Sequence, residues 1–258
     1  MIDLHSHILP GVDDGASDIE ESAAILKNME QKGVRKIAAT PHYPLYKDRD
    51  FKKFIGEKVK QLKQKAEAEN IEIEILSGSE ILVEKKLPWL LNDNKLLTIN
   101  DSDYLLIETH PILLPDYFPE IIHDIQAMGF KIIIAHPERY SFIQKEPRLL
   151  YDWIELYDLK LMLNSSSILG LHGEKAQNTA EKLLDTGLCH LMSSDTHGID
   201  RRPFTLDKAL QIAEKIRKGS YKIFSENAEA VLANGKVKSF EIKEKRNSIF
   251  KKLFSFII

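Results

Sequence analysis

Histidines and carboxylates recur along the chain, and most of them directly follow a short apolar run. His5 and His7 stand two residues apart, so at the end of a strand both imidazoles would point to one face. Alone, this pair could equally cap a strand or share a metal ion. Ionisable groups after the other apolar runs favour the metal-site interpretation, because so many of them gathered in one place would be costly without bound cations. The groups expected to converge are His5, His7, His42, Glu80, Glu108, His136, Asp195 and His197.

The chemical types in this set indicate which metals and reactions it suits. Imidazoles and carboxylates without a thiolate favour Mn, Fe or Zn over softer metals. Eight groups are too many for one ion, so we expect two or three divalent ions. Adjacent ions generate a hydroxide near neutral pH and neutralise phosphoryl oxygens, as in phosphoester hydrolysis. The sequence therefore predicts a metal-dependent phosphatase.

Three arginines follow these groups closely and are candidate catalytic residues. Arg139 lies three residues after His136, and Arg201 and Arg202 lie just beyond His197. A guanidinium binds a phosphoryl group through two parallel hydrogen bonds and keeps its charge. Arg139 is directly in the loop after a predicted strand, whereas Arg201 and Arg202 could equally be ordinary surface residues.

A predicted turn follows the first histidine pair, at Gly-Val-Asp-Asp-Gly in positions 11–15. Asp13 and Asp14 either favour this turn through their own side chains, or one of them orients a ligand histidine. The remaining histidines do not follow the pattern of strand ends, and we expect them to be structural or solvent-facing, although one could reach the site. They are His110, His123, His172 and His190.

Other phosphatase and hydrolase chemistries find little support in the sequence. A cysteine-based phosphatase needs an arginine six positions after its cysteine, but Asp195 occupies that position after Cys189. Cys189 lies at a predicted strand, so we expect a buried, inert thiol. The chain also contains neither a Gly-x-Ser-x-Gly nucleophile elbow nor a phosphate-binding Gly-x-x-x-x-Gly-Lys-[Ser/Thr] loop.

The apolar runs predict the strands that position these groups, and amphipathic segments between them predict helices. One helix is expected to open at a capping box, Ser17–Glu20, and another covers about 119–128. Strand followed by helix, about seven times, is typical of a parallel barrel or a doubly wound sheet. Six of the seven strand ends carry His, Glu or Asp, which favours a distorted (β/α)7 TIM-like barrel in the α/β class. The expected strands are 2–4, 36–40, 71–76, 104–107, 131–135, 159–163 and 190–193.

Composition limits the remaining possibilities. The 258 residues suffice for one large domain, which we place at 1–238, and a formal net charge of −3 argues against general nucleic-acid binding. A single cysteine, no secretory signal and no apolar run of about 20 residues predict a cytoplasmic protein without a transmembrane segment. Residues 239–258 predict a basic amphipathic tail, which either packs on the domain or contacts a membrane or a membrane-bound partner. Its apolar face is Phe250, Leu253, Phe254 and Ile257, with Lys245, Arg246, Lys251 and Lys252 among them.

Five motifs in order along the chain resemble the polymerase-and-histidinol-phosphatase (PHP) superfamily. They resemble most closely its bacterial protein-tyrosine phosphatases, which regulate capsule and exopolysaccharide synthesis. The resemblance extends from residue 1 to about 235, and the first and fourth motifs are specific. The motifs are His-Ser-His-Ile-Leu-Pro-Gly-Val-Asp-Asp-Gly at 5–15, Thr-Pro-His at 40–42, Ser-Gly-Ser-Glu at 77–80, Ala-His-Pro-Glu-Arg-Tyr at 135–140 and Ser-Asp-Thr-His at 194–197.

This resemblance implies a PHP-type barrel with a trinuclear site that favours manganese. By matching position, all eight converging groups would be metal ligands, and Arg139, Arg201 and Arg202 would hold phosphate. The implied substrate is a phosphotyrosine protein, a membrane-associated bacterial tyrosine kinase that controls polysaccharide export. Two alternatives stay open: a phosphatase of small metabolites such as histidinol phosphate, and a catalytically silent metal-binding regulatory module. A metallo-amidohydrolase is disfavoured by the flanking arginines.

Overall fold

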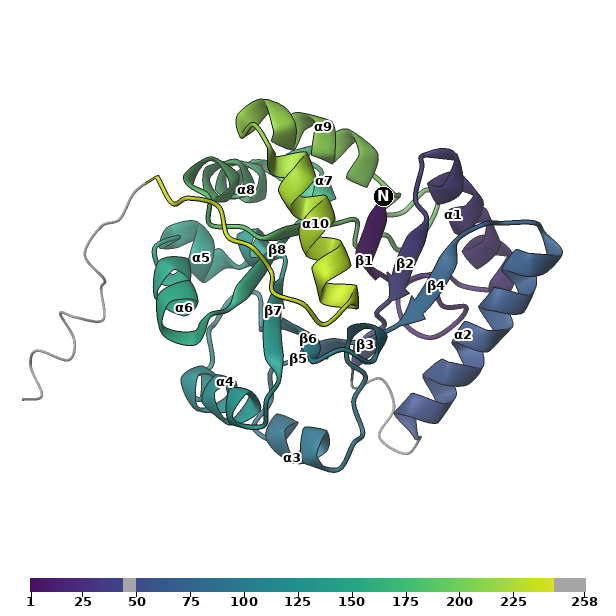
Figure 1. The fold of residues 1–258 in the computed structure, drawn as a ribbon, viewed down its shortest axis with the longest axis horizontal. Coiled ribbons are helices and arrows are strands. Elements are labelled where there is room, and N and C mark those ends of the chain that lie inside the picture. The colour runs from purple at the N-terminus through teal and green to yellow at the C-terminus, as the bar shows by residue number, and fades with distance from the viewer. Residues whose placement is uncertain (44–49, 244–258) are drawn as a thin grey trace, which may run out of the picture.

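Parallel strands form two sheets in this computed structural model, which describes residues 1–43 and 50–243 (Figure 1). The smaller sheet has the order β1-β2-β4, with β1 at Ile2–Ser6, β2 at Lys36–Ala39 and β4 at Glu74–Ser77. The larger sheet has the order β3-β5-β6-β7-β8-β9. Its strands are β3 (His42–Tyr43), β5 (Glu80–Leu82), β6 (Tyr104–Glu108), β7 (Lys131–Ala135), β8 (Lys160–Asn164) and β9 (Leu191–Ser193). The predicted α/β class with parallel strands is therefore confirmed.

The two sheets are neighbours at both edges. Strands β3 and β5 begin soon after β2 and β4 end, and β3 pairs with β5 as β2 pairs with β4. Beyond β9, Thr196 forms a parallel bridge with Ser6, and the backbone N–H of His7 donates to the carbonyl of Thr196 at 2.9 Å. The chain after β9 therefore lies beside the end of β1.

Helices follow the strands and cover their outer side (Figure 1). Two short 3-10 turns, η1 (Ile99–Asp101) and η2 (Pro137–Arg139), lie between the strands. The helices are α1 (Ile19–Gln31), α2 (Phe51–Ala68), α3 (Leu87–Asn92), α4 (Phe118–Ala127), α5 (Ser141–Lys145), α6 (Leu149–Tyr157), α7 (Ser165–Ile168), α8 (Glu174–Thr186), α9 (Leu206–Ile216) and α10 (Ser220–Leu232).

The first helix begins one residue later than the capping box predicted. The N-cap is Asp18, whose carboxylate accepts the backbone N–H groups of Glu20 and Glu21. Ser17 instead donates its backbone N–H and its hydroxyl to the Glu21 carboxylate, each at 2.8 Å. An ionised carboxylate satisfies the unpaired N–H groups of the first turn and also interacts favourably with the helix dipole. The assignment of Ser17 as the cap was therefore wrong.

A small apolar cluster, here called the inner cluster, packs between the strands of the two sheets. Strands of both sheets contribute to it, and Ala228 and Val231 of α10 cover it. In Figure 1, α10 crosses in front of the strands. The strand residues are Leu4, Ala38, Leu76, Tyr104, Leu106, Ile133, Ala135, Met162 and Leu191. A second and larger cluster packs the outer helices against the sheets.

The first residues of the predicted tail pack on the body of the protein. The Phe240 ring is buried against Phe224, with 5.8 Å between the ring centroids. The backbone N–H of Lys243 donates to the carbonyl of Thr186 at 3.1 Å. The rest of the tail, residues 244–258, lies outside the described residues.

Within residues 1–43 and 50–243, none of the helices combines the length and the apolar character needed to cross a membrane.

Candidate metal centre

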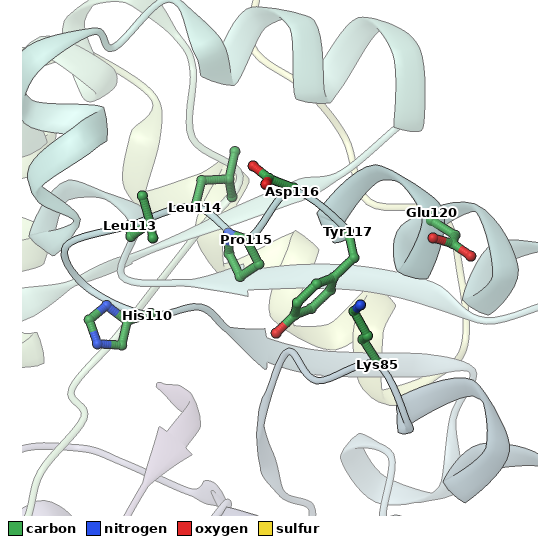
Figure 2. A pocket seen from close by; sticks show the side chains of 8 residues that line it. All are labelled: Lys85, His110, Leu113, Leu114, Pro115, Asp116, Tyr117 and Glu120. Carbon is green, nitrogen blue, oxygen red and sulfur yellow. The ribbon is translucent and has the colours of Figure 1, made fainter.

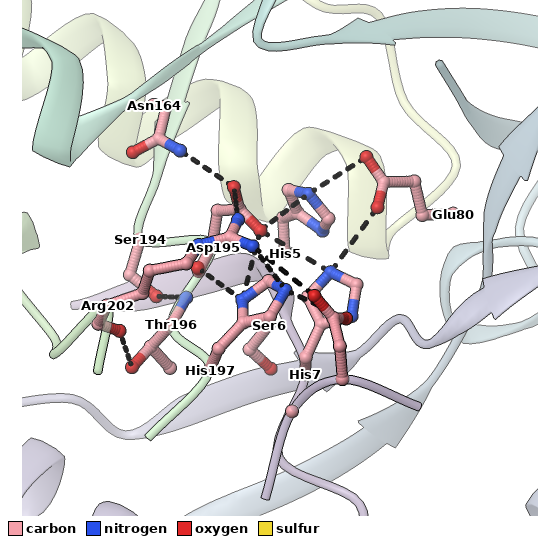
Figure 3. Close-up of polar contacts among 12 residues, drawn as sticks. His5, Ser6, His7, Glu80, Asn164, Ser194, Asp195, Thr196, His197 and Arg202 are labelled. Carbon is pink, nitrogen blue, oxygen red and sulfur yellow. Dashed lines mark hydrogen bonds and ion pairs between the residues drawn. The ribbon is translucent and has the colours of Figure 1, made fainter. Parts of the chain in front are cut away.

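The eight groups predicted to converge do lie together, beside the carboxyl ends of the strands. Figure 3 shows His5, His7, Glu80, Asp195 and His197 among them. His5 is on β1, His42 opens β3, Glu80 opens β5 and Glu108 ends β6. His7, His136, Asp195 and His197 lie in the segments that follow β1, β7 and β9. His42 and Glu108 are partly exposed, and the other six are buried.

Glu80 lies at the centre of the cluster, and its side chain is fully buried. Its Oε1 is 2.7 Å from Nε2 of His136 and 3.3 Å from Nε2 of His5. Its Oε2 is 3.0 Å from Nδ1 of His42 and 3.3 Å from Nε2 of His7. One carboxylate therefore faces four imidazoles, two from the end of β1 and one each from β3 and the segment after β7.

Asp195 supplies a second buried carboxylate from the opposite side. Its backbone is left-handed, with φ of 53°, and its N–H donates to the carbonyl of His5 at 2.9 Å. Such a backbone is uncommon outside glycine and tends to occur at functional sites. Oδ1 of Asp195 lies 3.4 Å from Nε2 of both His5 and His7. Oδ2 accepts a hydrogen bond of 2.7 Å from the Asn164 side chain.

The inward-facing atoms of this cluster are the ones without hydrogen bonds. Nε2 of His5 and His7, Oε2 of Glu80 and Oδ1 of Asp195 are buried and find no hydrogen-bond partner among the described residues. Unsatisfied buried polar atoms are costly, so several that face one point indicate a missing ligand. Four overlapping groups have their ligand atoms within 4.8 Å of one another. They are His5-His7-Glu80, His5-His136-Asp195, His42-Glu80-Glu108 and His7-Asp14-His42-His197. The donor set therefore fits divalent metal ions.

Hydrogen bonds to the outer nitrogens orient the first two imidazoles. Nδ1 of His5 lies 2.7 Å from Oγ1 of Thr40, and Nδ1 of His7 lies 2.7 Å from Oδ2 of Asp13. Such contacts direct the other ring nitrogen towards a metal. Asp13 also accepts the N–H of Gly15, so it stabilises the turn as well. A side chain at Gly15 would collide with the His7 carbonyl, 1.9 Å from the added Cβ.

Asp14 joins the cluster, which the sequence did not assign. Its Oδ1 lies 3.3 Å from Nε2 of His197 and 3.5 Å from Nε2 of His42. The hydrogen bond to His197 lowers the pKa of Asp14 below its usual range. Asp13 therefore fulfils both alternatives, because it orients His7 and stabilises the turn, whereas Asp14 faces the cluster, which neither alternative described.

The electrostatics of the cluster favour bound cations. Burial raises the pKa of Glu80, but His5, His136 and His42 outweigh it and hold this pKa well below the usual range. Burial lowers the pKa of His42, yet Glu108 and Glu80 raise it to about 10. Despite burial, neighbouring carboxylates also raise the pKa of His7 well above its usual range, so His7 and His42 carry protons where metal ions would otherwise balance the carboxylates. Since histidine binds a metal in its neutral form, loading a metal releases such protons.

Two of the three predicted arginines reach the cluster. Nη1 of Arg139 donates to Oδ2 of Asp195 at 2.8 Å, and Nη2 of Arg202 donates to the same oxygen. Nη1 of Arg202 also lies 2.7 Å from Nε2 of His197. Arg201 instead points its guanidinium at the backbone carbonyl of Asp14. The left-handed backbone of Arg202, with φ of 52°, gives these neighbouring side chains different directions.

The other histidines and the cysteine lie outside the cluster. His190 is buried before β9, His123 is exposed on α4, and His110 lines a separate pocket. Of these histidines, His172 is influenced by the charges of the site: burial, Arg139 and Arg202 lower its pKa to about 4. The thiol of Cys189 is fully buried, and burial raises its pKa far above the usual range. An inert thiol was predicted, and this environment agrees.

Asn164 is a contributor that sequence reasoning missed. Its Nδ2 donates to Asp195, and its Oδ1 caps α7 by accepting the N–H of Ser166 at 2.8 Å. Its position at the end of a predicted strand was a usable signal. The other predicted strand ends carry histidine or carboxylate side chains, and an amide does not stand out among them as a candidate ligand.

Known proteins resemble this chain along most of its length. A family model described as capsular polysaccharide synthesis, CpsB/CapC, matches residues 1–233. The tyrosine-protein phosphatase YwqE of Bacillus subtilis is 34% identical over 237 residues, covering 91% of this chain and 92% of the relative. The putative tyrosine-protein phosphatase CapC of Staphylococcus aureus is 35% identical over 239 residues, covering 92% and 90%.

A solved structure gives the same result in three dimensions. It belongs to a crystallographic study of YwqE from Bacillus subtilis and CpsB from Streptococcus pneumoniae, described as unique metal-dependent tyrosine phosphatases. It superimposes with a TM-score of 0.89 at 33% sequence identity and covers 96% of this chain and 100% of the other. The arrangement of strands and helices is therefore shared along nearly the whole length.

Proposed function

Because this chain belongs to the CpsB/CapC family of capsular polysaccharide synthesis, we propose that it is a metal-dependent protein-tyrosine phosphatase. The observation that carries the proposal is the cluster of buried imidazoles and carboxylates whose inward atoms lack hydrogen-bond partners among the described residues, with two guanidinium groups at its edge. This donor set suits hydrolysis of a phosphate ester, because the charges of the phosphoryl group need cations on several sides.

We propose all eight predicted groups as metal ligands, with Asp14 as a further candidate. Glu80, His5, His7 and His42 each occur in two of the four overlapping groups, so the donors suffice for two or three ions. Nitrogen and oxygen donors without thiolate suit manganese, iron or zinc, and the resemblance to the PHP phosphatases makes manganese the favoured metal. When bound, such ions supply Lewis acidity and acidify water. The described residues themselves hold the imidazoles in place through Thr40 and Asp13.

The arginines are proposed to bind the phosphoryl group. Arg139 and Arg202 already share Oδ2 of Asp195, so their guanidinium groups lie at the edge of the cluster. There they can neutralise the charge that develops on phosphoryl oxygens in the transition state. Arg201 would first have to leave the carbonyl of Asp14, which its guanidinium contacts. We retain all three as proposed phosphate-binding residues.

The proposed substrate is a phosphotyrosine protein, a membrane-associated bacterial tyrosine kinase of capsule or exopolysaccharide synthesis. The family description supports the process, and the chemistry of the leaving group supports tyrosine. Phenol has a pKa of about 10, so a phenolate departs with less proton donation than an alkoxide. The buried Cys189 thiol suits the cytoplasmic location that we propose.

We infer that the two sheets form one distorted (β/α)7 barrel of the PHP type within a single domain, residues 1–238. Counting β2 with β3, and β4 with β5, as continuous strands gives seven strands in the described residues. The bridge between Ser6 and Thr196 and the shared inner cluster support closure. The tail at 239–258 remains a proposed peripheral contact.

Turnover on three substrates tests the function. With Mn present, kcat/KM should be highest on a phosphotyrosine peptide and lower on a phosphoserine peptide and on histidinol phosphate. A preference for histidinol phosphate would overturn the proposed protein substrate but not the proposed metal-dependent reaction. Absence of hydrolysis of all three by the Mn-loaded protein would favour a silent metal-binding module instead.

A further inference from the structure

Large apolar side chains are exposed in the loop of residues 109–117, which joins β6 to α4. Ile112 and Leu113 are 70% and 69% exposed. Single exposed apolar residues are ordinary, but two adjacent ones beside a candidate site indicate a contact surface. This loop starts directly after Glu108, one of the proposed metal ligands.

Hydrogen bonds hold this loop in one conformation, so the exposure is a property of a fixed surface. The backbone N–H of Ser141 donates to the carbonyl of Pro111 at 2.7 Å, and its hydroxyl donates to the carbonyl of Ile112 at 3.1 Å. At the far end, the N–H of Phe118 donates to the carbonyl of Pro115 at 2.9 Å. Ser141 lies two residues after Arg139, so the loop is anchored to the segment that carries this arginine.

The loop forms one wall of an open pocket with a volume of about 660 Å³ (Figure 2). Leu113 and Pro115 line it together with the ring of Tyr117, and Nζ of Lys85 lies 5.3 Å from the centre of that ring. Asp116 and Glu120 also line the pocket. These carboxylates would repel the anionic surface of a membrane, so a protein segment is the better occupant.

One edge of the pocket lies close to the proposed reaction centre along the chain. His110, which lines the pocket, is two residues after Glu108, and two residues of extended chain span at most about 7 Å. A peptide whose phosphotyrosine occupies the centre would cover this separation with two or three of its own residues.

We propose that this pocket binds an apolar side chain that lies within about three residues of the phosphotyrosine in the protein substrate. This inference rests on the proposed phosphatase function and adds a subsite to it. Contacts outside the reacting group lower KM and distinguish one peptide from another, whereas a small aryl phosphate cannot reach them.

A leucine scan with the full-length, Mn-loaded protein tests the subsite. One leucine is moved through the three positions on each side of phosphotyrosine in a peptide that otherwise contains serine and glycine. At one position the wild type should show a kcat/KM roughly tenfold above that for the peptide without leucine, mainly through KM. Leu113→Ser should remove this advantage and leave hydrolysis of p-nitrophenyl phosphate unchanged.

Leu156→Ser is the matched control, because Leu156 is 54% exposed on α6, away from the pocket. Equal leucine advantages in the Leu113→Ser and Leu156→Ser proteins would overturn the subsite while the phosphatase function stands. So would a dimer, seen in sedimentation velocity, that Leu113→Ser alone abolishes, since a second copy would then occupy the pocket. Failure of the wild type to hydrolyse either the peptides or p-nitrophenyl phosphate would overturn the function, and the subsite with it.

Discussion

The metal-centre candidate and the surroundings of His190 both bury histidine among polar groups, at opposite ends of the strands. Around His190 each polar group has a partner: its Nδ1 accepts the N–H of Leu161 at 3.1 Å, and its Nε2 lies 3.2 Å from Oγ of Ser239. Asn227 donates to the carbonyl of His190 at 2.7 Å and to that of Lys238 at 2.9 Å. We call these side chains, His190, Asn227 and Ser239, the His190 cluster.

At the other end of the strands, the inward atoms of His5, His7 and Glu80 are buried without hydrogen-bond partners in the described part of the chain. His190 is as deeply buried as His5 and His7, so burial alone does not distinguish the two regions. The hydrogen bonds do: a satisfied cluster supports the fold, and an unsatisfied one requires something from outside. Four predictions examine this difference, from the largest expected effect to the smallest.

Removing metal should abolish the activity and leave the His190 cluster unaffected. Excess chelator should reduce turnover of p-nitrophenyl phosphate by more than about a thousandfold, because the orphaned donors lose the ions that they hold. Added Mn should restore turnover and raise the melting temperature, since a ligand that binds only the folded state stabilises it. Cys189→Ala should behave as the wild type throughout. Full activity in excess chelator would contradict a metal-dependent reaction.

Arg139→Ala should lower kcat about a hundredfold, which corresponds to roughly 3 kcal/mol of transition-state stabilisation. Lysine should rescue this variant poorly because it lacks the planar fork of two donors. Metal content, measured by elemental analysis, should stay at the wild-type level. The matched control is Arg148→Ala, an exposed arginine at the start of α6. Wild-type turnover in Arg139→Ala with metals still bound would remove this arginine from the mechanism.

Asn227→Ala should have the opposite effect to Arg139→Ala: it should lower the free energy of unfolding and leave kcat unchanged. It leaves the carbonyl of His190 and two backbone groups of Lys238 without their partners. A loss of about 2–3 kcal/mol in the free energy of unfolding is expected from urea titration. The kcat on p-nitrophenyl phosphate should not change. Asn178→Ala, at an exposed position of α8, should change neither quantity. A large loss of kcat in Asn227→Ala would contradict a purely structural role for the His190 cluster.

The smallest effect is a pH dependence from His190. Burial lowers the pKa of His190 to about 3, so the unfolded chain binds its proton first as pH falls below about 6.5. The stability that neutral His190 contributes to the folded protein is therefore fully present above pH 6.5 and is lost as pH falls towards 3. Between pH 7.5 and 5.5 the wild type should lose about 1 kcal/mol of unfolding free energy more than His190→Asn, which keeps an acceptor for Leu161.

Urea titrations in excess chelator measure this difference, because the metal site then contributes equally to both proteins. His123→Asn, at an exposed position of α4, should follow the wild type. Parallel pH curves for the wild type and His190→Asn would mean that His190 is not held neutral by the fold.

The positions of the eight converging groups could be predicted because each depends on local sequence alone. An apolar run followed by His, Glu or Asp marks a strand end, and parallel strands bring their ends to one side. The order of strands and helices follows from the same pattern. The extra helix after β7 could not be anticipated so easily, since α5 and α6 are short and closely spaced.

The details that escaped prediction depend on backbone turns between distant segments. Asp14 faces His197 in a loop that folds back on β1, so that Gly15 packs against the His7 backbone. The sequence alone does not predict this contact. The difference between Arg201 and Arg202 follows from the left-handed backbone at Arg202. Neighbouring residues of one type carry no signal for such a choice.

The position of helix α10 limits the routes by which substrate can enter and products can leave. Ala228 and Val231 of α10 pack on the inner cluster at the end of the strands opposite the site, so the proposed barrel would have a packed core rather than a passage. Substrate therefore enters, and both products leave, by the same opening. Inorganic phosphate that has not yet departed then occupies the place of the next phosphoryl group, which makes it a competitive inhibitor in kinetic terms.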